Sequence, residues 1–274
     1  MSTVSATRPE AVPAQAPLSA APFTALLRSE WLKVRSVRAL LAALAVIALV
    51  TVGFSLLSCA TLADSEARGP GFDPVFQSFF GLNFGQAAAI SFGAMAVAAE
   101  YRDGGIRLSL TAVPHRGRLY AAKLVVVGAL CLAVGLITAL VSYGGGQALL
   151  GAYGVGHGAG GAASEPVAVR AVVGCALYLA LIGLCAAGLT TVLRSGAAAM
   201  GLLVPFVLLM SFVLGNVAEG GGGVVEFLPD HAGRQILLQH PAGTLGPWSG
   251  TAVLAGWTAL ATGAGWAALR RRDA

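Results

Sequence analysis

The chain has 274 residues, of which 57% are hydrophobic and only 11% are charged, and its formal net charge is +5. Soluble globular proteins contain about 25% charged residues, so this composition excludes an ordinary water-soluble domain. The positive charge needs no nucleic acid to explain it, because basic residues also gather at the inner face of a membrane.

The N-terminal part of the chain divides into two segments. Residues 1–22 are rich in Ala, Pro and Ser and are predicted to form a disordered cytoplasmic tail. In residues 23–38, apolar side chains recur at helical spacing, namely at Phe23, Leu27, Trp31 and Val34. This pattern predicts an amphipathic helix at the membrane interface, although Glu30 interrupts the apolar stripe. The alternative is a simple extension of the first membrane span.

Six apolar segments follow, and each reaches the roughly 20 residues that a helix needs to cross a bilayer. They lie at about residues 39–59, 75–99, 119–148, 168–193, 196–216 and 248–269. Backbone groups in hydrocarbon must be paired inside their own segment, so these segments are predicted to be helices. The predicted fold class is therefore all-α, a polytopic membrane protein with six transmembrane helices in a single domain at residues 23–274.

The distribution of basic residues predicts the orientation. If the six segments cross in turn, 14 of the 17 Lys and Arg residues lie on one side, and the other three, Arg68, Arg170 and Arg234, lie on the opposite side. The positive-inside rule places the more basic side, with both termini, in the cytoplasm. Arginine greatly outnumbers lysine, and Ala and Gly are abundant, which is typical of a GC-rich bacterial gene. The predicted location is a bacterial plasma membrane.

The sequence lacks three common motifs of nucleotide-binding and catalytic sites. It contains no G-x-x-x-x-G-K-[ST] nucleotide motif, no H-E-x-x-H zinc motif and no G-x-S-x-G nucleophile motif. The chain is therefore predicted not to be an enzyme and to hold no cofactor or metal. Charged residues are also missing from the centres of the six segments, which disfavours an ion-coupled secondary carrier.

The second apolar segment holds most of the polar residues within the predicted spans. Asn83 and Gln86 are three residues apart, so they share one helical face, and Ser91 follows. Two interpretations remain open. In the first interpretation, these residues line a translocation path. In the second, they support close helix packing together with nearby glycines.

The stretch EYRDGGIRLSLTAVPHRGRLYAAK, residues 100–123, is unusually rich in charge for this chain. Ile106, Leu110 and Val113 have the spacing of one helical face, between Gly104 and Pro114. Alternation of apolar residues over 106–112 also fits a strand. A short helix is favoured, because no partner strand is apparent in the sequence.

The segment RSEWLKVRS before the first span, and AEYRDGGIRLSLTAVPHRGRLYAAK after the second, resemble permease subunits of type-2 ATP-binding-cassette (ABC) transporters. FLPDHAGRQIL, before the last span, is similar to an external segment of that family. The residues that match the pattern are Glu100, Tyr101, Arg102, Gly104, Pro114, Arg116 and Lys123. Gly105 departs from it, because the family often has threonine there.

The resemblance implies an ATP-driven exporter. Two permease copies, identical or different, pair with separate ABC ATP-binding subunits that bind ATP and Mg²⁺, and membrane lipid surrounds them. The loop at 100–123 carries a short coupling helix that docks on the ATP-binding subunit, and Glu100 pairs with a nearby Arg or Lys at the membrane edge. The expected coupling residues are Glu100, Arg102, Gly104, Ile106, Leu110, Val113, Pro114, Arg116 and Arg118.

Two other functional classes are weighed against the exporter. The first is a non-transporting membrane anchor or immunity-type subunit, which binds a partner without passing substrate. The second is a secondary carrier or membrane-embedded enzyme, which the missing midplane charges and catalytic motifs disfavour.

Overall fold

The computed structural model describes residues 22–66, 72–101, 116–154, 165–217, 223, 225–241 and 243–272. The predicted tail and the predicted coupling helix therefore lie outside the described residues. Within these ranges the chain is helical and contains no strand. In chain order the helices and 3-10 turns are α1 (Phe23–Ser36), α2 (Arg38–Glu66), α3 (Pro74–Gln77), α4 (Leu82–Tyr101), α6 (Arg116–Ala152), α7 (Glu165–Leu193), α8 (Gly196–Val217), η2 (Val225–Phe227), α9 (Pro229–Arg234), η3 (Gln235–Leu237) and α10 (Pro247–Arg272).

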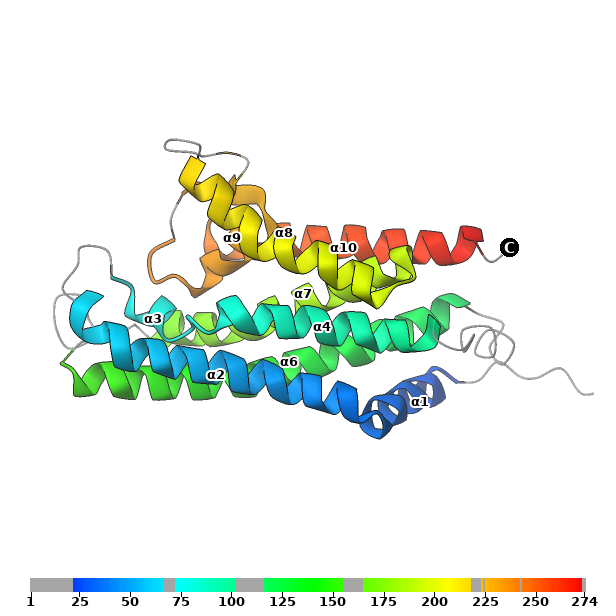
Figure 1. Cartoon of the computed structure of the whole chain (residues 1–274), viewed down its shortest axis with the longest axis horizontal. Coiled ribbons are helices and arrows are strands. Elements are labelled where there is room, and N and C mark those ends of the chain that lie inside the picture. Colours follow the sequence, from blue (N-terminus) through cyan, green and yellow to red (C-terminus); the bar gives the residue numbers. More distant parts are fainter. Residues whose placement is uncertain are drawn as a thin grey trace, which may run out of the picture.

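Five of these helices, α2, α4, α6, α7 and α10, are long and apolar enough to cross a membrane. The all-α fold class is thus confirmed for the described residues, and the helices are those of a membrane protein. The predicted fifth span corresponds to α8, which has 22 residues. The apolar stretch described for α8 is Gly196–Leu209, where its described side chains end, and α8 is inclined to the other long helices (Figure 1). A sixth crossing therefore stays a prediction.

The helix α7 lies inside the bundle, where it contacts α4, α6 and α10. It is the most buried of the five long helices. Its approach to α4 is close because two glycines meet there. A Cβ added at Gly93 of α4 would lie 2.0 Å from the carbonyl oxygen of Gly183. Small residues of this kind let membrane helices come into direct backbone contact.

The apolar segment predicted as one helix at 75–99 is interrupted, which corrects that prediction. The short α3 is capped by Asp73, whose side chain accepts hydrogen bonds from Val75 N at 2.9 Å and Phe76 N at 3.0 Å. Residues 78–81 then form a turn, and α4 begins at Leu82. The turn lies against α2, because a Cβ at Gly81 would lie only 1.9 Å from the backbone oxygen of Thr51. The apolar composition of residues 75–99 does not reveal this interruption.

The outward faces of the long helices are apolar. Leu49 of α2, Ile137 of α6 and Leu260 of α10 are among the large side chains that no other part of the described chain covers. Contiguous exposed apolar surface of this extent is unfavourable in water and expected in lipid. Several hydroxyl groups inside the bundle donate to carbonyls of their own helix. Thr190, for example, donates to the Ala186 carbonyl at 2.7 Å.

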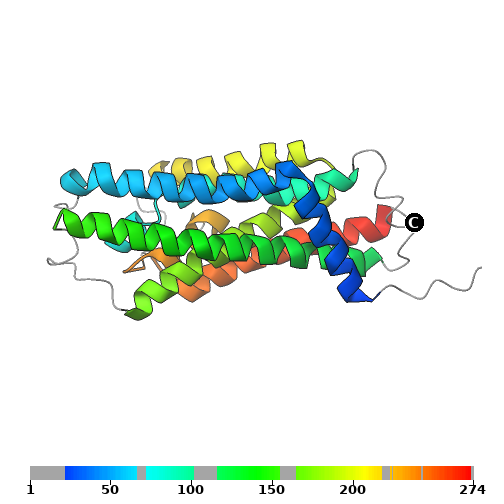
Figure 2. The same cartoon turned by 90° about the horizontal axis from the view of Figure 1, so that it is seen from below.

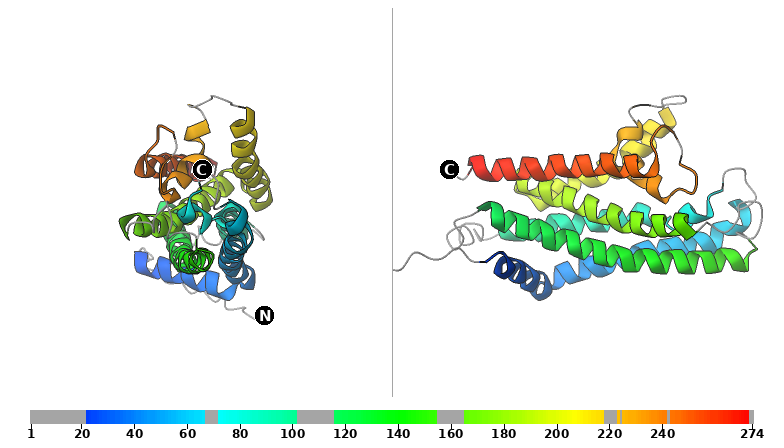
Figure 3. Two further views of the ribbon diagram at one scale, coloured as in Figure 1. Left: turned by 90° about the vertical axis from the view of Figure 1, so that its left-hand side faces the viewer. Right: turned by 180° about the vertical axis from the view of Figure 1, so that it is seen from behind.

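The two ends of the bundle differ in charge. We call them the α1 end, which holds α1, the end of α4, the start of α6 and the C-terminus, and the opposite α9 end (Figures 1 and 3). The described basic side chains at the α1 end are Arg28, Lys33, Arg35, Arg38, Arg118, Lys123, Arg194, Arg270 and Arg271, with the acidic Glu30 and Glu100. The α9 end holds the acidic Asp73, Glu226 and Asp230 with the basic Arg170 and Arg234. This asymmetry is the one that the positive-inside rule describes.

Candidate functional site

The helix α1 lies crosswise over α6 at one end of the bundle (Figure 2). Leu26, Glu30 and Val34 are spaced by four residues, so they form one face, and this face is buried. Leu26 packs against Leu119 of α6. Glu30 therefore belongs to the buried face of α1, and its position in the apolar stripe brings a carboxylate into the bundle. Trp31, assigned to the stripe from the sequence, instead points outward and is 48% exposed.

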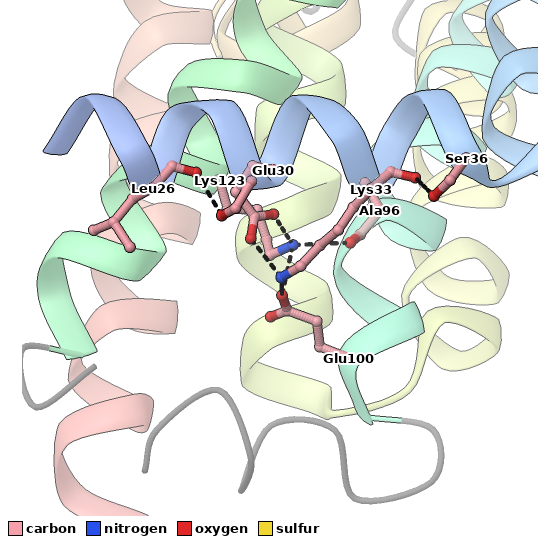
Figure 4. Close-up of polar contacts among 8 residues, drawn as sticks. Leu26, Glu30, Lys33, Ser36, Ala96, Glu100 and Lys123 are labelled. Atoms are coloured by element: carbon pink, nitrogen blue, oxygen red, sulfur yellow. Dashed lines mark hydrogen bonds and ion pairs between the residues drawn. The ribbon is translucent and has the colours of Figure 1, made fainter. Parts of the chain in front are cut away.

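Glu30 belongs to a cluster of four charged side chains, which we call the α1 ion-pair cluster (Figure 4). Lys123 Nζ lies 2.6 Å from Glu30 Oε2 and 3.0 Å from Glu100 Oε1. Lys33 Nζ lies 2.6 Å from Glu30 Oε1 and 2.9 Å from Glu100 Oε1. Each ammonium thus bridges both carboxylates. The chain contains only two lysines, and both are in this cluster.

The members of the cluster differ in burial. The side chains of Glu30 and Lys123 are 3% and 8% exposed, Glu100 is 15% exposed, and Lys33 is 45% exposed. Lys123 also donates to the Ala96 carbonyl at 3.3 Å, so its three ammonium hydrogens each have an acceptor. Two positive and two negative charges balance, which is the condition under which buried charges are tolerated.

The electrostatics of Lys33 follow from this arrangement. Partial burial acts to lower the pKa of Lys33, but the nearby carboxylates of Glu30 and Glu100 outweigh that effect and raise it above its ordinary value. Lys33 is therefore a permanent cation at neutral pH, and it closes the cluster on its solvent side.

The cluster joins three segments that are far apart in the sequence. Glu30 and Lys33 come from α1, Glu100 from the last turn of α4 and Lys123 from the early part of α6. Residues 102–115 connect α4 to α6. Both flanks of that connection are therefore fixed to the same short helix. A displacement of the connection would act on α1, α4 and α6 together.

A cavity of about 290 Å³ lies next to the cluster, between α1, α2, α4 and α6. The four charged residues form one side of this cavity, and Leu40, Val126 and Val127 form apolar parts of its wall. The cavity leaves unfilled space beside the ion pairs, between α1 and the bundle.

The predicted coupling residues can be followed only in part. Glu100 pairs with lysine, and the expectation of a basic partner at the helix end is confirmed. Arg116 is the first residue of α6, and Arg118 is half-buried in its first turn. The other predicted coupling residues lie outside the described residues, namely Arg102, Gly104, Ile106, Leu110, Val113 and Pro114.

Sequence reasoning did not assign a role to Glu30 or to Lys33. The available signal was a single acidic residue within an apolar helical stripe, since a carboxylate there requires a buried cation. The identity of the cation that pairs with Glu30 depends on how α1 crosses α6, and no local sequence pattern encodes this crossing.

A second polar network lies towards the α9 end. The Tyr178 hydroxyl of α7 contacts the side-chain oxygen of Gln86 and lies 3.0 Å from Asp230 Oδ1. Arg234 donates from Nε to the same Asp230 oxygen at 2.7 Å. Gln86 also donates to the Asn83 carbonyl at 3.1 Å. The short helix α9 thereby brings a buried carboxylate to the middle spans, which a scan of the spans alone missed.

The structure separates the three polar residues of the second segment. Asn83 lines a cavity of about 460 Å³ together with Phe84, His231 and Arg234. Gln86 is fully buried in the Tyr178 network and does not line this cavity. Ser91 donates to the Ala87 carbonyl of its own helix at 2.8 Å. Asn83 therefore borders the cavity, whereas the side chains of Gln86 and Ser91 form hydrogen bonds within the bundle.

Comparisons with known proteins add no assignment. No protein-family model matches this sequence, and no curated protein matches it. The resemblance to type-2 ABC permeases therefore rests on the quoted residues, and the functional proposal on the geometry of the described helices.

Proposed function

We propose that this chain is the membrane-spanning permease subunit of an ATP-driven ABC exporter. The observation that carries the proposal is the α1 ion-pair cluster, which fixes α1 to both flanks of the 102–115 connection. The helix α1 lies across the end of the bundle, and buried charges fix it to two spans. This arrangement is suited to convert a movement of that connection into a movement of the spans. The proposal includes six spans, with α8 as the fifth.

The energy source in this proposal is a separate subunit. The chain has no Walker-type motif, so ATP and Mg²⁺ are bound by an ABC ATP-binding partner that docks on the 102–115 connection. The basic α1 end faces the bacterial cytoplasm, in agreement with the positive-inside rule, and both termini lie there. A second permease copy completes the transporter.

The cavity beside Asn83 supports a translocation role at the α9 end. It combines aromatic walls from Phe76 and Phe84 with the polar groups of His231 and Arg234. Such a mixture suits a substrate with both apolar and polar parts, and an amphiphile, drug or peptide is the substrate class that we propose.

The test is a matched pair of deletions in the complex with an ABC ATP-binding subunit. Removal of residues 104–113 should abolish the permease-stimulated ATP hydrolysis while the chain still inserts in the membrane. Removal of residues 155–164, an equally long piece of a loop at the other end, should leave the stimulation intact.

The outcomes also separate the competing functions. If the chain binds the ATP-binding subunit but never alters its hydrolysis, the non-transporting anchor or immunity-type subunit is correct. Normal stimulated hydrolysis after removal of residues 104–113 would show that coupling does not pass through this connection.

A further inference from the structure

The face of α1 that points away from the bundle combines basic and apolar side chains. Trp31 and Leu32 are 48% and 53% exposed, and Arg28 and Arg35 are also exposed. Because these residues are separated by three, four and seven positions, they form one face of the helix. We call this set, Arg28, Trp31, Leu32 and Arg35, the outer face of α1.

The two arginines are not used by the rest of the described chain. Neither Arg28 nor Arg35 forms an ion pair or a side-chain hydrogen bond with another described residue. The only acidic residue of α1 is Glu30, which points into the bundle and is bound to lysine. The outer face therefore presents uncompensated positive charge.

The position of α1 determines what this face meets. The helix α1 crosses the long helices obliquely at the end of the bundle, near the level at which a membrane surface would lie (Figure 2). Exposed apolar side chains lie on both sides of the junction between the helices, at Leu32 of α1, at Val37 and at Leu41 of α2. The outer face thus lies close to the apolar surface of a span.

We infer that the outer face of α1 binds the headgroups of anionic phospholipids. Trp31 and Leu32 would insert at the level of the headgroups, where Trp is favoured, while Arg28 and Arg35 reach the phosphates. Guanidinium groups bind phosphate oxygens in a bidentate manner, which suits arginine better than lysine here. This inference needs only the fold and its membrane location, and it is independent of the proposed transport.

The experiment measures lipid preference in the full chain. The purified chain in detergent is offered phosphatidylglycerol and phosphatidylcholine in competition, and the retained lipid is counted by native mass spectrometry. The variant Arg28→Gln/Arg35→Gln should lose about thirtyfold in preference for phosphatidylglycerol, since each of the two basic residues near an anionic surface contributes about 1 kcal/mol. Its unfolding temperature should equal that of the wild type, because both side chains are exposed.

The matched control is Arg270→Gln/Arg271→Gln, which removes the same charge from α10 at the same end of the molecule. This control should keep most of the preference. Equal loss in both variants would mean a general charge effect and would overturn the inference. The inference would also be overturned if the Arg28→Gln/Arg35→Gln variant kept its preference for phosphatidylglycerol. Loss of affinity for an ATP-binding subunit alone would overturn it as well, because that result would assign the outer face of α1 to a protein partner.

Discussion

Lys123 is the side chain on which the α1 ion-pair cluster depends most. It is almost completely buried, and it contacts both carboxylates as well as the Ala96 carbonyl. Loss of one member of a buried pair leaves charge without compensation, which costs far more than the loss of an exposed pair. Lys33 contacts the same carboxylates but lies half in solvent.

We expect Lys123→Met to destabilise the protein by about 3 kcal/mol, because Glu30 and Glu100 then share only the half-exposed Lys33. Lys33→Met should cost less than about 1 kcal/mol, as is usual for ion pairs near the surface. The measurement is thermal unfolding of the purified chain in detergent. Equal losses in the two variants would contradict the burial difference between the two lysines.

Glu226 gives the α9 end a sensitivity to acid. The hydroxyl and backbone amide of Thr244 donate to its carboxylate, the amide at 3.1 Å, and these hydrogen bonds hold the pKa of Glu226 below its ordinary value. A lowered pKa in the folded state means that the carboxylate stabilises the fold above pH 4.5, and that this contribution is lost as the pH falls through the lower folded value.

We therefore expect the unfolding temperature to drop as the pH falls below about 4.5 and to drop less in Glu226→Gln, which cannot titrate. Thr244→Val is the companion variant, since it removes the hydroxyl donor and should also flatten the pH dependence. An identical acid response in the wild type and in Glu226→Gln would refute this role of the carboxylate.

At the scale of single helices, α4 and α7 are joined by their glycines. The Gly93–Gly183 contact leaves no room for a side chain, because a Cβ at position 93 would overlap the facing carbonyl. A methyl group there must push the helices apart, and overpacking of this kind costs about 1–3 kcal/mol.

The expected result for Gly93→Ala is a lower unfolding temperature and reduced yield of folded protein. Gly201→Ala in α8 is the control, since a Cβ at Gly201 meets nothing within 4 Å and alanine is the better helix former. Thermal unfolding in the same detergent compares the two. A tolerated Gly93→Ala would mean that α4 and α7 do not approach as closely as described.

Helix positions could be predicted from the sequence where apolar length alone decides. The spans α2, α6, α7 and α10 follow long charge-free runs, and lipid leaves a helix as the available structure. The start of α4 could not be predicted, because Gly81 ends a turn that packs closely against Thr51 of α2, and no local pattern encodes this contact. The same holds for α1, whose buried face follows from its crossing over α6.

The candidate site was predictable to a similar degree. The resemblance to the permease family implies a basic partner for Glu100, and the structure provides two, Lys33 and Lys123. The identity of these partners, and the part of Glu30, depend on which residues face each other across three helices. Asp230 likewise reaches Tyr178 only because α9 folds back on the bundle.

For the molecule as a whole, the open structural question is whether α8 crosses the membrane. Cysteines introduced at Ser109, Ser164 and Gly220 would report the sides of the three loops concerned, and the native cysteines are buried and give little background. With six spans, a membrane-impermeant thiol reagent applied to cells should label positions 164 and 220 but not 109. Protection of position 220 would place both ends of α8 on the same side.

The most direct measurement of the central claim is ATP hydrolysis by the complex of this chain with an ABC ATP-binding subunit, reconstituted in lipid. Glu100→Gln keeps the shape of the side chain but removes the charge that both lysines share at the end of α4. We expect the variant complex to assemble and its stimulated hydrolysis to fall about tenfold, the equivalent of one charge-assisted hydrogen bond. The proposal that this chain couples to an ABC ATP-binding subunit would be contradicted if the variant complex hydrolysed ATP at the wild-type rate. It would also be contradicted if the wild-type chain did not bind the ATP-binding subunit.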